Sequence, residues 1–128
     1  MKILRTVLAT VMALFALVQL NDPDALVWTL VYAVVALALL LAAWRPDTLR
    51  GPFGRAATAA LLIGLLGLVV LRWPEQGAFW RREVWWEEET AREGLGVMIA
   101  FLAALFAVPR SRMRAVKSDR REGSDAGR

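Results

Sequence analysis

Two short polar segments carry the side chains of this sequence that could bind a ligand or do chemistry, and both adjoin long apolar runs. The first is Gln19-Leu20-Asn21-Asp22-Pro23-Asp24, and the second leads through Glu89 and Arg92 to Glu93. Charged groups beside hydrocarbon cost free energy unless a partner or a function requires them. Carboxylates with an amide oxygen suit a hard divalent cation, whereas Arg92 beside tryptophan rings suits an anionic or lipid-like ligand. Neither set has a recognised metal-ligand spacing, so the metal question stays open.

The same side chains also have structural roles available to them. Asp22 is expected to cap the helix that begins at Pro23, and Asp24 to complement the dipole in its first turn. Arg92 is four residues beyond Glu88 and is expected to pair with it. On this interpretation the acidic segment before Arg92 is a solvated face.

Catalysis is the less favoured interpretation. A carboxylate pair could do general acid/base work, but the chain has no cysteine and no histidine, and its serines lie only in the last eighteen residues. It therefore has no thiol nucleophile, imidazole base or conventional zinc site. We predict no catalytic residue and no cofactor.

The elements that must position the polar segments are apolar helices. Hydrophobic residues make up 58% of the 128 residues and gather in four runs, at about 3–20, 25–44, 56–72 and 90–108. A helix of ~20 apolar residues crosses ~30 Å of hydrocarbon. The pattern predicts an all-α, integral membrane four-helix bundle over residues 1–108, with a loop at residues 45–55. The last run has to begin near residue 90 to be long enough, which brings Glu89, Arg92 and Glu93 close to hydrocarbon.

The remaining segments lie outside the predicted bundle. Tryptophans, arginines and glutamates alternate between the third and fourth runs, a mixture typical of a short amphipathic helix in the membrane interface. Glutamates outnumber arginines there, so nucleic-acid binding is not expected. Residues 109–128 form a basic tail that is too polar to fold alone, and its basic start favours anionic headgroups.

Small residues recur at helical spacing in two of the runs and predict close helix packing. They are Ala9, Ala13 and Ala16 in the first run, and Ala60, Gly64 and Gly67 in the third. Gln19 continues the first stripe and is expected to face into the bundle.

Trp28 and Tyr32 share one face of the second run, one turn beyond the acidic segment. Aromatic rings at this depth commonly lie at the membrane–water interface, which is the interpretation we favour for them. The alternative is that both rings line a shallow pocket with Gln19 and Asn21.

Basic residues are distributed unequally between the two sides of the predicted membrane. With both termini cytoplasmic, that side holds 12 of the 16 lysines and arginines, and the opposite side holds four. The positive-inside rule therefore predicts N-in, C-in, with both polar segments facing outward. The abundance of alanine, leucine, valine and arginine indicates a GC-rich bacterial genome, and hence the inner membrane.

These residues resemble the transmembrane protein 220 family. The resemblance rests on Gln19-Leu20-Asn21-Asp22-Pro23-Asp24 with Trp28 and Tyr32, and on Glu89-x-x-Arg92-Glu93-x-Leu95-Gly96. It covers the region from about residue 4 to 108. It implies a small multi-pass membrane protein of uncharacterised function and supplies no reaction or ligand.

Two functions follow as hypotheses. The first is a non-catalytic membrane component that interacts with lipid or protein, the partner being the bilayer, a second copy of the chain or another membrane protein. The second is an outward-facing binding or transport site for a small polar ligand or divalent cation. The candidate ligand-binding residues are Gln19, Asn21, Asp22, Asp24, Trp28, Tyr32, Glu89, Arg92 and Glu93.

Overall fold

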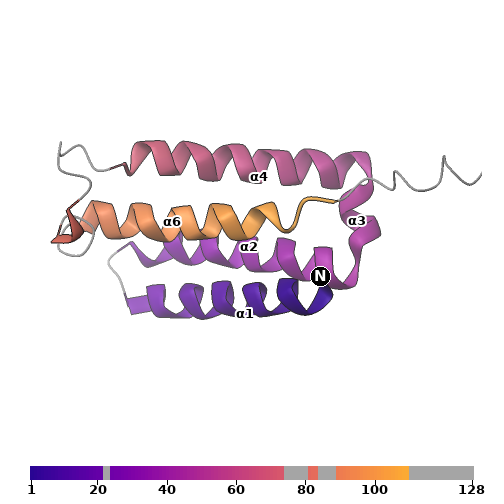
Figure 1. The fold of residues 1–128 in the computed structure, drawn as a ribbon, viewed down its shortest axis with the longest axis horizontal. Helices are drawn as coiled ribbons and strands as arrows, with labels where there is room; N and C mark the ends of the chain where they lie inside the picture. The colour runs from indigo at the N-terminus through magenta and orange to yellow at the C-terminus, as the bar shows by residue number, and fades with distance from the viewer. Residues whose placement is uncertain (22–23, 74–80, 84–88, 110–128) are drawn as a thin grey trace, which may run out of the picture.

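Long helices run side by side and connect the two ends of the molecule. A computed structural model describes residues 1–21, 24–73, 81–83 and 89–109, and within them the long helices are α1 (Lys2–Val18), α2 (Ala25–Trp44), α4 (Pro52–Leu71) and α6 (Glu89–Leu105). Figure 1 shows α6 lying between α4 and α2, with α1 on the far side of α2. The helices alternate in direction, so the start of α1 and the end of α6 lie at the same end.

Short helical elements join or extend the long ones. The 3-10 turn η1 (Gln19–Asn21) continues α1, and α3 (Pro46–Arg50) links α2 to α4. The predicted loop over residues 45–55 was therefore wrong. Pro46 and Pro52 each stand in the first turn of a helix, where a residue without a backbone N–H loses nothing.

The start of α2 also differs from the expectation. Asp24 is the N-cap residue, not a member of the first turn, and its side chain makes no capping hydrogen bond. Its backbone oxygen instead accepts from the Val27 N–H at 3.2 Å. The predicted cap, Asp22, lies outside the described residues, as do most of the predicted interfacial helix and the tail beyond residue 109.

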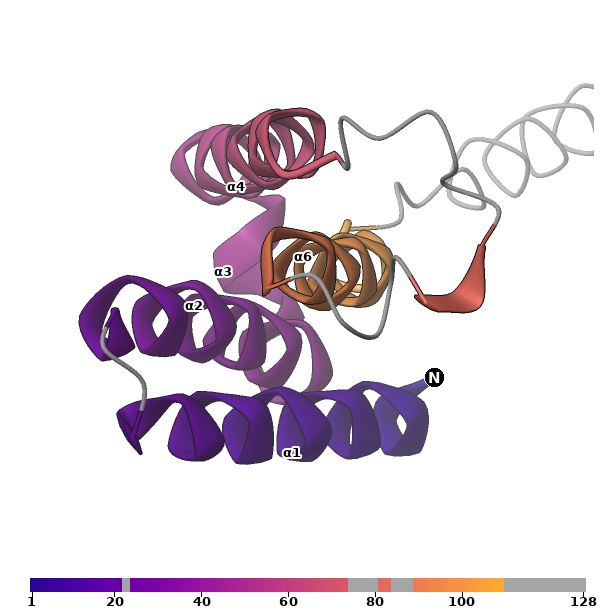
Figure 2. The same cartoon turned by 90° about the vertical axis from the view of Figure 1, so that its left-hand side faces the viewer.

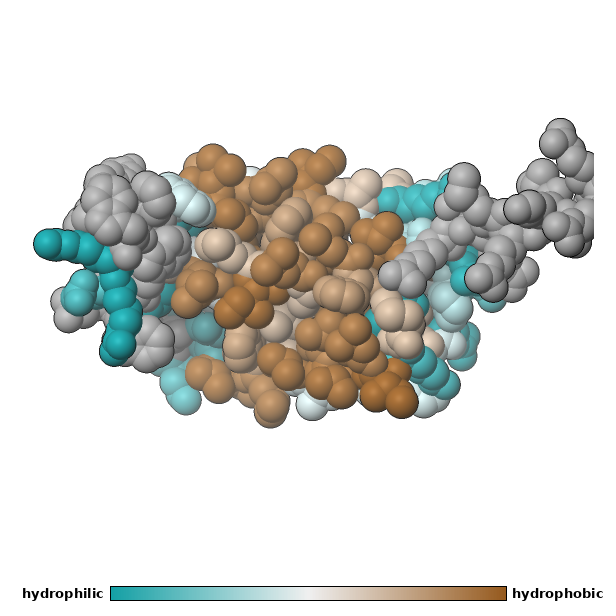
Figure 3. Space-filling model, in the orientation of Figure 1, coloured by the Kyte–Doolittle hydropathy of each residue, from teal (hydrophilic) through white to brown (hydrophobic). Residues whose placement is uncertain are grey.

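The predicted all-helical class is confirmed for the described part of the chain. Three segments are long and apolar enough to cross a membrane: Lys2–Asn21, Ala25–Trp44 and Pro52–Leu71. The 17 residues of α6 give a rise of roughly 26 Å, slightly less than the ~30 Å hydrocarbon core. The face of the molecule shown in Figure 3 is apolar across its middle and has polar residues towards both ends, as a membrane protein requires.

The core lies where α6 meets α2 and α4 and where α1 packs on α2. Its largest fully buried side chains are Met12, Val35, Leu39 and Val97. Along α6 and the turn after it, the buried side chains are mostly alanines (Ala91, Ala100, Ala103, Ala104 and Ala107). Small side chains let neighbouring backbones approach closely, which explains how α6 fits between two helices. Figure 2, the view along the helices, shows this central position.

The small-residue stripes are used only in part. Ala9 and Ala16 are buried with Met12, but Ala13 is exposed. Ala60, Gly64 and Gly67 are all exposed, and a Cβ atom added at either glycine would meet nothing within 4 Å. The predicted close packing of the third run through these residues was therefore wrong within a single chain, because α4 turns its other face to α6.

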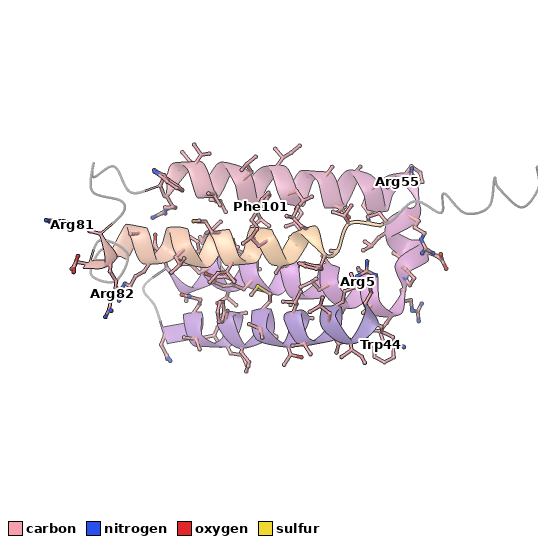
Figure 4. All side chains as sticks on the ribbon, viewed as in Figure 1. Arg5, Trp44, Arg55, Arg81, Arg82 and Phe101 are labelled. Carbon is pink, nitrogen blue, oxygen red and sulfur yellow. The ribbon has the colours of Figure 1, made fainter. Side chains whose placement is uncertain are left out.

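Arg5 of α1 forms hydrogen bonds to the ends of α2 and α6, at the end of the molecule that holds the N-terminus. Its Nε donates to the Phe106 carbonyl oxygen at 2.8 Å, and its Nη1 donates to the Ala42 carbonyl oxygen at 2.7 Å. Both acceptors are at helix ends, where carbonyls lack intrahelical partners. We call this end, with Lys2, Arg5, Arg50 and Arg55, the basic end. Figure 4 shows Arg5, Trp44 and Arg55 there and Arg81 and Arg82 at the opposite end.

Candidate functional site

An ion pair joins α4 to α6 at the end opposite the basic end. The Arg72 Nη1 donates to a carboxylate oxygen of Glu93, and the two side chains are 39% and 19% exposed. The Arg72 guanidinium also lies over the Trp28 ring, 5.3 Å from its centroid. The charges of Arg72 and Glu93 therefore neutralise each other, and the Trp28 ring covers one side of the guanidinium.

Trp28 and Tyr32 lie inside the protein. Their exposed fractions are only 4% and 3%, so the favoured prediction that both rings sit at the membrane interface was wrong. The Tyr32 ring meets Phe15 of α1 edge to face, with centroids 5.6 Å apart. Because α2 is enclosed by α1 and α6, its aromatic face packs against helices and not against headgroups.

Gly96 provides space for the Tyr32 hydroxyl. A Cβ atom at Gly96 would stand 2.1 Å from that oxygen, closer than real contacts allow. Gly94 has a similar role two residues earlier, where a Cβ would stand 2.5 Å from the Arg72 carbonyl oxygen. These glycines let α6 approach α2 and α4 at the level of the ion pair.

An open groove of about 490 Å³ lies between α1 and α6, next to the ion pair. We call it the α1–α6 groove. Its apolar lining comes from Phe15, Val18, Leu95 and Ile99, and the other lining residues are Gln19, Tyr32, Arg92 and Gly96. It is therefore largely hydrophobic along its length, with one amide and one guanidinium contributed near the helix ends.

The structure brings together five of the predicted site residues in two adjoining places. Gln19, Tyr32 and Arg92 line the groove, and Trp28 and Glu93 flank Arg72. The alternative prediction was a pocket lined by Trp28 and Tyr32 with Gln19 and Asn21; of these four residues, Tyr32 and Gln19 line the groove.

The other predicted residues are not part of this arrangement. Asn21 and Asp24 are exposed and do not line the groove. Asp22 and the Glu89 side chain lie outside what the structure describes, and so does Glu88, the predicted partner of Arg92. In the described part of the chain, no three acidic side chains gather as a metal site would require.

Arg72 is the charged site residue that sequence reasoning missed, and Phe15, Val18 and Ile99 of the groove wall were missed as well. In the sequence, Arg72 ends an apolar run, a position where an arginine commonly marks the membrane–water interface. A usable signal was present, because an arginine that ends one span on the acidic side of the membrane is a natural partner for a glutamate that begins the next.

Helices α2, α4 and α6 and the α1–α6 groove all fall within one region of similarity to a known family. The family described as Transmembrane family 220, helix, matches residues 11–108. No curated protein and no solved structure matches the chain significantly. The match covers well over half of the sequence and contains every residue of the groove and of the ion pair, so this protein belongs to transmembrane family 220.

Proposed function

We propose that the protein is a non-catalytic, lipid-interacting membrane component that binds an amphipathic anionic molecule in the α1–α6 groove. An acyl chain would lie along Phe15, Val18 and Ile99, with its negative headgroup at Arg92 and Gln19. The observation that carries this proposal is a groove that joins apolar walls to a guanidinium at one end. Binding sites that are mostly apolar with a few polar groups to fix orientation are typical of ligand pockets.

The charges around the groove favour an anion over a cation. Glu93 is engaged by Arg72, so its negative charge is already compensated. Arg92 is exposed, and no described residue forms a hydrogen bond or ion pair with its guanidinium. A guanidinium binds carboxylate or phosphate through two parallel hydrogen bonds. The alternative, a small polar ligand or divalent cation, depends on side chains outside the groove or outside the described residues.

Binding is tested with probes that share a dodecyl chain and differ in headgroup charge. The purified protein in neutral dodecyl maltoside is heated with laurate or with dodecyltrimethylammonium. Laurate is expected to raise the unfolding temperature and the cationic probe is not. A ligand at a hundred times its dissociation constant adds roughly 2.7 kcal/mol to the stability of the folded form.

Three variants localise the effect. Arg92→Gln should abolish the shift with laurate, and Arg55→Gln, which removes an equal charge at the basic end, should keep it. Ile99→Trp fills the groove without changing charge and should also abolish the shift. A laurate effect that survives in both Arg92→Gln and Ile99→Trp would refute the proposal.

We further propose that α1, α2, α4 and α6 all span a bacterial inner membrane as a four-helix bundle with the basic end in the cytoplasm. The lysines and arginines at that end support this orientation through the positive-inside rule. Because the chain has no cysteine, single cysteines report topology directly. In spheroplasts, an impermeant maleimide should label Arg81→Cys, and label Asp47→Cys only after lysis. The opposite pattern would reverse the orientation.

A second proposal is self-association through α2 and α4. An apolar groove of about 460 Å³ separates these helices, and its lining includes Val34, Ala60 and Gly64. A helix of another copy would find small residues there that allow close approach. Gly64→Leu should reduce cross-linking between copies, while Gly67→Leu, which is equally exposed but does not line the groove, should not. If both variants cross-link equally, the groove between α2 and α4 is not the surface through which copies associate.

A further inference from the structure

A small crevice with two arginines lies at the basic end, away from the α1–α6 groove. Its volume is about 160 Å³. Arg5 of α1 and Arg50 of α3 line it, together with apolar or backbone surface from Leu49, Pro46 and Pro109. It is therefore a recess between helix ends with positive charge on two sides.

Both arginines have hydrogen-bond donors left over. Arg5 uses its Nε and Nη1 for the two helix-end carbonyls, which leaves further N–H groups of its five unused by those bonds. The Arg50 Nη1 pairs with Asp47 at 2.6 Å. The Arg50 Nε is buried, and within the described part of the chain it has no hydrogen-bond partner. The Arg50 Nε is closed off from solvent, so a group bound in the crevice would accept from the other N–H groups of the two guanidiniums.

The charge of the crevice is positive overall. Asp47 is the carboxylate that contacts Arg50, but its side chain is 89% exposed and it does not line the crevice. The walls between the two arginines are apolar or backbone. An anion with several acceptor oxygens therefore fits better than a neutral group or a cation.

The depth of the crevice matches the headgroup layer. Beside it, the Lys2 ammonium lies 3.5 Å from the centroid of the Trp44 ring, and Trp44 is 61% exposed. Tryptophan and lysine at the end of a span are typical of the membrane–water interface. Basic pockets between spans at this level bind the phosphates of anionic lipids. We propose that the crevice binds the phosphate of an anionic phospholipid headgroup through Arg5 and Arg50.

The test uses the full chain in detergent, titrated with phosphatidylglycerol and observed by native mass spectrometry. Arg50→Gln should weaken binding of one lipid about tenfold, the loss expected for a charge-assisted hydrogen bond. Arg45→Gln removes an exposed charge from the same end without touching the crevice and should bind as the wild type does. Asp47→Asn frees the Arg50 Nη1 and should bind at least as tightly, which shows that altering α3 does not itself abolish binding.

Other outcomes overturn the proposal. Equal affinity in Arg50→Gln and Arg45→Gln would mean that the crevice is not the site. If Arg92→Gln loses the bound phosphatidylglycerol, the lipid binds in the α1–α6 groove and not in the crevice. The crevice test does not depend on laurate binding, so a failure of laurate to bind in the groove would leave the crevice proposal standing. If inorganic phosphate displaces phosphatidylglycerol at equal concentration, the crevice is a site for free phosphate and not for a lipid headgroup.

Discussion

Gly96→Ala isolates the contact that sets how closely α6 approaches α2. The added methyl group would stand 2.1 Å from the Tyr32 hydroxyl oxygen and 3.4 Å from the ring carbon that bears it. The second distance is tolerable, so the clash belongs almost entirely to the hydroxyl. That oxygen must move by more than an ångström, but the Tyr32 ring is 3% exposed and held by Phe15. The tyrosine therefore has little room in which to yield.

The expected cost is about 1–3 kcal/mol, the usual penalty for an extra methyl group in a packed interior. Alanine also favours a helix over glycine by up to ~1 kcal/mol, which would hide part of that cost. Gly64→Ala removes this ambiguity, because it makes the same change in a helix where the new Cβ meets nothing within 4 Å. The difference between the two variants is then the steric term alone.

Reversible unfolding in mixed micelles measures both free energies, and Tyr32→Phe supplies the decisive comparison. Removing the hydroxyl should restore most of the stability that Gly96→Ala loses, which gives a coupling free energy of about 1–2 kcal/mol in a double-mutant cycle. If Gly96→Ala is as stable as Gly64→Ala, or if Tyr32→Phe gives no rescue, the account of this contact is wrong.

Three further changes test other contacts by the same unfolding measurement. Glu93→Gln should lower stability by about 1–2 kcal/mol, less than for a fully buried pair because Arg72 is 39% exposed; an unchanged midpoint would mean that the pair is screened. Arg5→Met leaves two helix-end carbonyls without their donor and should cost about 2 kcal/mol. Gly54→Ala places a Cβ 2.2 Å from a backbone carbonyl oxygen, which cannot rotate away, and should cost about 3 kcal/mol; Gly67→Ala, where the space is open, should be neutral or stabilising.

Apolar run lengths made the helices predictable, but they could not show which face of each helix is covered. The runs located the long helices to within a few residues, since a helix that crosses hydrocarbon needs a nearly continuous apolar sequence. In lipid, however, an exposed face is as apolar as a buried one. Alternation of polar and apolar residues therefore gives no signal, and this is why Ala13 and Gly64 were placed inside the bundle and Trp28 and Tyr32 at its edge.

The site was predictable to the extent that it depends on charge. Polar residues at the end of a span stand out against hydrocarbon, so Gln19, Arg92 and Glu93 were found. Arg72, the partner of Glu93, and Gly96, which faces Tyr32, were harder to find because helix pairing defines both contacts. Charge complementarity between Arg72 and Glu93 hints at the contact between α4 and α6, but three-dimensional packing sets its geometry, for which the sequence has no local pattern.

Four arginines in the described part of the chain fall into two groups by how their donors are used. Arg72 is matched by a carboxylate and an aromatic face, and Arg5 gives two of its donors to carbonyls at helix ends. Such donors hold helices together, so the loss of either arginine should lower stability, and the loss of Arg5 should also weaken lipid binding in the crevice. In the described part of the chain, the Arg92 guanidinium has no such partner, and Arg50 is paired with the exposed Asp47. Arg92 lies in an apolar groove, and Arg50 lies in a basic crevice at the opposite end. A charge that contributes little to folding is free to bind a ligand, so substitution of Arg92 or Arg50 should reduce lipid binding far more than it reduces stability.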